Sequence, residues 1–135
     1  MPRPRRSLRE QSIDNPLFAN SELEAKVLGA WITLPGWAEQ HRHLLRPVIF
    51  AENRHNLLAR ALLKYSEHHK PPFDLVHLSE YVAAQFGGGP ESWSLIISKC
   101  ATSAPLSQSI ADGMLERLCT YHNRRVLDET GMRLK

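Results

Sequence analysis

Residues 21–32 read SELEAKVLGAWI and residues 50–63 read FAENRHNLLARALL, and these two stretches decide the fold. Both repeat apolar residues at the spacing of one helix face. The apolar positions of the first stretch are Leu23, Val27, Leu28, Trp31 and Ile32. Those of the second, continued by two residues, are Leu57, Leu58, Ala61, Leu62 and Tyr65. A stripe with this period predicts an amphipathic helix that buries one face in a core.

Cap and turn residues predict where the first two helices begin and end. Ser21 and Glu24 have the spacing of a capping box, so a first helix of about a dozen residues is expected to start at Ser21. The Pro-Gly pair at 35–36 ends it. A second helix is expected over residues 37–46, because Pro47 has no amide hydrogen to continue it.

Proline and glycine clusters separate the remaining helices. These helices are expected at residues 52–68, 74–86 and 91–102, and from 107 towards the C-terminus. The clusters lie at residues 71–72 and 87–90 and at Pro105. No stretch alternates with period two. The sequence therefore predicts an all-α fold, a compact bundle of about six helices with a long C-terminal helix that begins a helical hairpin.

Length and composition fit one modest domain. The chain has 135 residues, of which 42% are hydrophobic and 23% are charged. We expect a disordered basic arm at 1–14, a globular helical domain at 15–105 and a C-terminal interaction helix, the hairpin arm, at 106–135. No apolar run is long enough for a membrane helix, and two cysteines are too few for a disulfide framework. These features indicate a cytoplasmic protein without a membrane partner.

The positive charge is concentrated in the N-terminal arm. Arg3, Arg5, Arg6 and Arg9 against Glu10 supply the whole net charge of +3, so residues 11–135 carry 13 basic and 13 acidic side chains. A domain that grips phosphates normally has a basic face. Any DNA contact is therefore expected to be weak or indirect, and to use Arg3, Arg5 and Arg6.

The last helix has two offset apolar stripes. One consists of Ile110, Met114, Leu118 and Tyr121, and the other of Leu115, Cys119, His122 and Val126. One stripe is enough to dock a helix on a core, so the second indicates a partner helix. The expected partner-binding residues are Ile110, Met114, Leu118, Tyr121, His122, Arg125 and Val126. The alternative, that the second stripe closes the domain's own core, stays open.

The motifs of catalytic and metal sites are missing from the sequence. It has no G-x-x-x-x-G-K-[ST] phosphate loop and no G-x-S-x-G elbow, so we expect neither nucleotide hydrolysis nor another enzyme activity. The seven histidines and two cysteines lack the local spacing of a zinc site, so no metal or cofactor is expected. His55, near a helix start, is expected to bond to a loop carbonyl. The three tryptophans, beside apolar stripes, are expected to anchor a core or an interface.

Four motifs together carry a family resemblance. They are EAKVLG at 24–29, Phe50 with HNLL at 55–58, KPPFDLV at 70–76 and the glycine loop at 87–89. In order and spacing over about residues 15–130, the chain resembles the N-terminal domain of DnaB-type replicative helicases. It departs from the family at Lys26, where an acidic residue is common, and at the extra residue of the Pro72-Phe73 step.

The resemblance implies a non-catalytic role in DNA replication. Such domains pair through a long C-terminal hairpin, organise the helicase ring and dock the helicase-binding domain of primase. The implied partners are another copy of the chain, in a dimer or higher oligomer, the primase domain, and a helicase ATPase domain if the native chain continues. Two alternatives stay open: a stand-alone phage or plasmid adaptor that binds a helicase or primase, and a small helical DNA-binding protein.

Overall fold

The structure, a computed structural model, describes residues 16–130, with side chains described for residues 21–127. Its elements are α2 (Pro16–Thr33), α3 (Trp37–Gln40), the 3-10 helix η1 (Pro47–Ile49), α4 (Asn53–Tyr65), α5 (Leu75–Phe86), α6 (Pro90–Thr102) and α7 (Gln108–Thr130). Residues 16–130 contain six α-helices and no strand, and α7 is the longest at 23 residues. The predicted all-α fold with a long last helix is therefore confirmed. The arm predicted at 1–14 lies outside the described residues.

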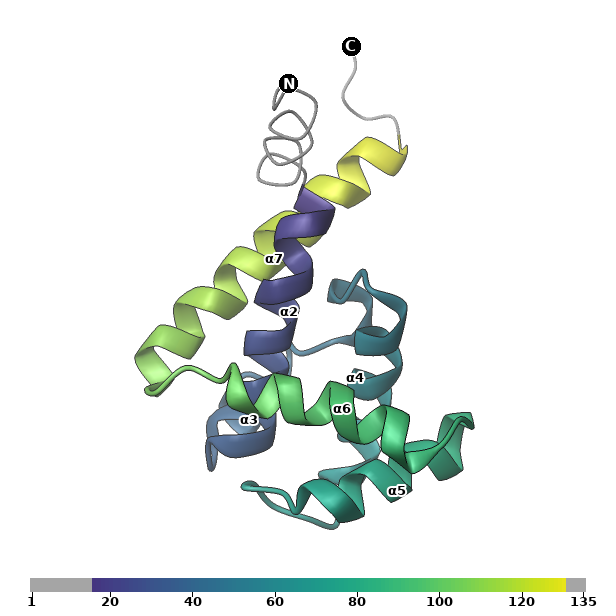
Figure 1. The fold of residues 1–135 in the computed structure, drawn as a ribbon. Helices are drawn as coiled ribbons and strands as arrows, with labels where there is room; N and C mark the ends of the chain where they lie inside the picture. Colours follow the sequence, from purple (N-terminus) through teal and green to yellow (C-terminus); the bar gives the residue numbers. More distant parts are fainter. Residues whose placement is uncertain (1–15, 131–135) are drawn as a thin grey trace, which may run out of the picture.

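Helix α2 is the central element of the bundle. It packs against α3, α4, α6 and α7, and α6 in turn packs against α5 (Figure 1). Leu28 and Ile32 of α2 are fully buried in the core that these helices share. Trp31, Trp37 and Trp93 are buried in the same core, as the sequence predicts. None of the described helices is both long and apolar enough to cross a membrane.

The predicted start of the first helix is wrong. Helix α2 begins at Pro16, so Ser21 lies inside the helix and does not cap it. The carboxylate of Glu24 points into the protein instead of back along its own helix. It accepts hydrogen bonds from the backbone N–H groups of Ala51, at 2.7 Å, and Glu52, at 3.3 Å. The capping-box spacing was therefore misleading, because Glu24 has a tertiary role.

The second helix is shorter than predicted, since α3 ends at Gln40 instead of continuing to residue 46. Residues 41–45 form turns, and Arg46 takes an extended conformation with φ −100° and ψ 141°. A residue before proline is driven out of the helical region by the proline ring. The helix expected at residues 74–86 is confirmed as α5, and Asp74 caps it, because Asp74 Oδ1 accepts from the backbone N–H of Val76 and His77.

Gly29 allows α2 and α6 to cross at very short range. A Cβ atom at this position would lie 2.0 Å from the carbonyl oxygen of Cys100 and 3.0 Å from Ala104. No other residue fits without moving one helix away from the other. The glycine of the VLG motif is thus required by the helix crossing.

Candidate functional site

The beginning of α7 is fixed to α3 and to the turn before it. Asp112 Oδ1 accepts a hydrogen bond of 2.7 Å from Trp37 Nε1 and lies 2.8 Å from His41 Nε2. Gln108 Nε2 donates to the Pro35 carbonyl oxygen at 3.0 Å. These contacts set the rotation of α7 about its axis, and therefore decide which residues face the core.

The core-facing row of α7 consists of Ala111, Leu115, Leu118 and His122. The first three are at most 1% exposed and His122 is 9% exposed. Leu118 and His122 were among the predicted partner-binding residues, and this placement corrects that assignment. Both side chains are covered by the domain itself, so a partner does not reach them on the folded surface.

The two predicted stripes are the flanks of one broad apolar arc. At 3.6 residues per turn, Leu118 and Leu115 lie next to each other in the middle of the arc, although the sequence assigns them to different stripes. Met114 and Tyr121 on one flank, and Cys119 on the other, are half-buried against the core. The alternative reading, in which the second stripe closes the domain's own core, therefore holds for the middle of the helix.

Apolar side chains remain exposed at both ends of α7. Ile110 and Val126 were predicted there, and they are 50% and 39% exposed. Leu127 is 52% exposed, and Leu106, just before the helix, is 96% exposed. Sequence periodicity missed Leu106 because it precedes the helix, and Leu127 because it is off both stripes. We call Leu106, Ile110, Val126 and Leu127 the outer residues of α7.

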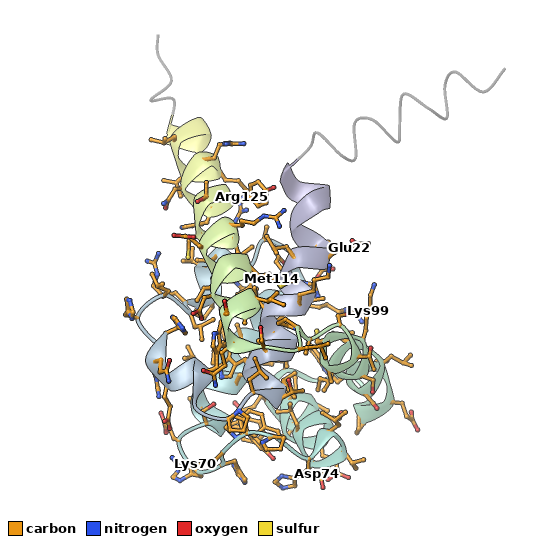
Figure 2. All side chains as sticks on the ribbon, turned by 90° about the vertical axis from the view of Figure 1, so that its left-hand side faces the viewer. Glu22, Lys70, Asp74, Lys99, Met114 and Arg125 are labelled. Carbon is orange, nitrogen blue, oxygen red and sulfur yellow. The ribbon has the colours of Figure 1, made fainter. Side chains whose placement is uncertain are left out.

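Arg125, also predicted to bind a partner, is half-buried and contacts η1. Its Nη2 atom donates to the Ile49 carbonyl oxygen at 3.4 Å. Its Nη1 atom is buried and has no hydrogen-bond partner in the described part of the chain. Figure 2 shows Arg125 and Met114 along α7. The guanidinium therefore contacts η1 within the domain, and its Nη1 atom is not open to another molecule.

A groove of about 390 Å³ follows another side of α7. It is lined by His41, Leu44, Asp112, Leu115, Glu116, Cys119, Thr120 and Asn123. Burial raises the pKa of the Cys119 thiol, and nearby Arg46 only partly opposes this effect. A nucleophilic cysteine needs a lowered pKa. The groove therefore brings a histidine, an aspartate and a cysteine together without activating the thiol.

The remaining sequence-predicted residues do not belong to α7. Arg3, Arg5 and Arg6, the predicted weak DNA contacts, are outside the described residues. His55 was predicted to bond to a loop carbonyl, and this was wrong: its Nδ1 atom lies 2.8 Å from Glu24 Oε1, inside the protein. No sequence signal links these two residues, because they belong to different helices.

No protein-family model, curated protein or solved structure matches the chain.

Proposed function

We propose that this chain is a non-catalytic protein-interaction domain of a replicative DNA helicase. In this role it pairs with other copies of itself, helps to organise the helicase ring and docks the helicase-binding domain of primase, in the cytoplasm. The observation that carries the proposal is the set of outer residues of α7. They stay exposed after the middle of the same helix has completed the core.

The structural roles of the four motifs support the resemblance on which the proposal rests. Glu24 and Gly29, from the first motif, make the contact with α4 and the crossing with α6. Phe50 is buried just before α4. Asp74 of the third motif caps α5, and Gly87 of the fourth ends it with φ 85°. Each motif thus has a physical function within one all-α fold.

A ring of subunits needs contacts that repeat with the same geometry in every copy. A long helix with exposed apolar residues supplies such a contact when it packs on a matching helix. Burial of apolar surface contributes roughly 25 cal/mol per Å².

The primase part of the proposal is tested by calorimetric titration of the chain with a primase helicase-binding domain from the same source. We expect saturable binding that Leu106→Asp and Ile110→Asp each weaken at least tenfold. Leu95→Asp is the matched control, because Leu95 is 75% exposed on α6, away from α7. Equal losses in all three variants, or no binding by the parent chain, would contradict primase docking.

The stand-alone adaptor alternative uses the same outer residues of α7 but a different molecule. It predicts capture of a complete helicase, and inhibition or loading of that helicase in a DNA-unwinding assay. If the chain is instead a domain of a longer helicase, the coding frame is predicted to continue past Lys135. Sequencing the native reading frame therefore separates the two.

A further inference from the structure

Two histidines from different elements meet beside the end of α4. The ring centroids of His69 and His77 are 5.4 Å apart, and the ring planes are inclined by 57°. Both side chains are exposed, and they line a hollow of about 330 Å³ with Lys70 and Asp74, which are labelled in Figure 2. Imidazole is a good ligand for zinc, copper and nickel. The pair therefore has the accessibility and the chemistry of a transition-metal site.

The spacing of the two rings matches a shared metal ion. In a tetrahedral zinc site the metal–nitrogen bond is about 2.0 to 2.1 Å, which places each imidazole centroid about 3.2 Å from the metal. Two such rings at the tetrahedral angle have centroids about 5.2 Å apart. The separation of His69 and His77, 5.4 Å, is close to this value. The distance between the rings is therefore compatible with one shared ion, which both Nε2 atoms would have to face.

Tyr65 holds the Nδ1 atoms of both histidines. His69 Nδ1 donates to the Tyr65 carbonyl oxygen at 3.1 Å, and a carbonyl can only accept, so the Nε2 atom of neutral His69 carries the free lone pair. His77 Nδ1 lies 2.7 Å from the Tyr65 hydroxyl. The His69 ring also stacks on the Tyr65 ring, with centroids 4.0 Å apart. Hydrogen bonds of this kind orient metal-binding histidines in many sites.

The charged neighbours are compatible with a bound cation. The ammonium group of Lys70 is paired with Glu39 at 3.2 Å, so its charge is partly compensated. Asp74, on the wall of the same hollow, contributes a negative charge.

We propose that His69 and His77 bind one Zn²⁺ ion through their Nε2 atoms, with Tyr65 as the positioning residue for both rings. No set of three or more His, Cys, Asp or Glu side chains within the described residues is arranged to hold a metal. The protein thus supplies two ligands, and water or a donor from another molecule completes the coordination. The sequence argument against a metal site considered local spacing, and it missed this pair because the fold brings the two rings together.

The test is calorimetric titration of the tag-free chain with zinc chloride. We expect one Zn²⁺ per chain, with a dissociation constant in the range of about 1 to 100 µM, since two ligands bind far more weakly than a four-ligand structural site. His69→Ala and His77→Ala should each weaken binding at least tenfold. Tyr65→Phe keeps the buried ring and removes the hydroxyl, so it should weaken binding by about tenfold.

Two controls make the result specific. His68→Ala removes an adjacent exposed histidine, and Cys119→Ser removes the more accessible thiol. Both variants should bind Zn²⁺ as the parent does, and circular dichroism should show the parent's melting temperature for every histidine variant. The proposal is overturned if the parent binds no Zn²⁺ at about 1 mM or if the His69→Ala/His77→Ala double variant binds as tightly as the parent. Unchanged affinity in Tyr65→Phe would refute the positioning role.

Discussion

Glu24 and His55 form a buried contact between α2 and the start of α4, with Glu24 Oε1 2.8 Å from His55 Nδ1. The Glu24 side chain is fully buried. The same carboxylate accepts from the backbone N–H groups of Ala51 and Glu52, which precede α4 and lack partners within a helix. One acidic side chain thus joins two helices and accepts hydrogen bonds from the backbone N–H groups that precede the second helix.

The first prediction is that Glu24→Gln destabilises the fold by about 2 to 4 kcal/mol. The variant keeps the size of the side chain but replaces one acceptor oxygen with an NH₂ donor that faces other donors, and buried polar mismatches of this kind are costly. Urea unfolding measures the effect. Glu22→Gln, on the exposed side of the same helix, is the control and should stay within about 0.5 kcal/mol of the parent. A Glu24→Gln variant as stable as this control would show that the contact has no structural role.

The second prediction concerns two glycines with opposite surroundings. Gly29→Ala should cost at least about 2 kcal/mol, because its Cβ would lie 2.0 Å from the Cys100 carbonyl oxygen and force α2 and α6 apart. Gly113→Ala, in α7, should stabilise by about 0.5 to 1 kcal/mol, because nothing lies within 4 Å of its Cβ position and alanine favours the helix. Thermal melting of the two variants should shift in opposite directions. A Gly29→Ala variant as stable as the parent would refute the close helix crossing.

The third prediction is a pH dependence caused by Cys100. Burial, as the main cause, raises the pKa of this thiol from 9.0 to about 12. A raised folded-state pKa means that the folded protein holds the proton longer than the unfolded chain. The contribution to stability is therefore complete below about pH 9 and is lost as the pH rises towards 12, by up to about 1.4 kcal/mol per pH unit.

The measurement for Cys100 is the difference in unfolding free energy between the parent and Cys100→Ala at several alkaline pH values. Other groups that titrate in this range are common to both proteins, so they cancel in the difference. We expect the stability advantage of the parent to shrink steadily above pH 9. A difference that stays constant up to pH 11 would mean that the folded environment does not hold the proton. Thiol labelling should also modify half-buried Cys119 before Cys100.

The cap at Asp74 and the breaks at 35–36 and 87–90 could be predicted from sequence because they are local. A capping carboxylate and its N–H partners lie within three residues of one another. The Glu24–His55 contact and the Gly29–Cys100 approach could not be predicted, because each joins different helices. The local pattern even predicts the wrong role for Glu24, which has the spacing of a capping box but accepts a hydrogen bond from the segment before another helix.

The site on α7 was only partly predictable for a related reason. The period of the apolar residues identifies an apolar face but does not show how deeply each residue is buried. The two stripes therefore could not be divided into a buried middle and exposed ends. Leu118 became a core residue, whereas Ile110 and Val126 stayed exposed. Packing of α7 against α2 and η1 decides how deeply each of its residues is buried, and the sequence does not reveal these tertiary contacts.

The fourth prediction separates core from surface on this helix. Leu118→Ala should destabilise the fold by roughly 2 to 5 kcal/mol, as buried large-to-small changes do. Leu127→Ala should change stability by less than about 0.5 kcal/mol, because the side chain is 52% exposed. Denaturant unfolding of both variants measures the contrast. Equal costs would mean that the middle of α7 and its C-terminal end are packed alike.

The most direct measurement of the central claim, that the outer residues of α7 form an interface, is sedimentation equilibrium across a wide concentration range. The parent chain is predicted to self-associate, and the Ile110→Asp/Leu127→Asp double variant to remain a monomer with an unchanged melting temperature. Leu95→Asp changes an exposed side chain of α6 and is predicted to associate like the parent. A double variant that associates as strongly as the parent, or a parent that stays monomeric at every concentration, would contradict the claim.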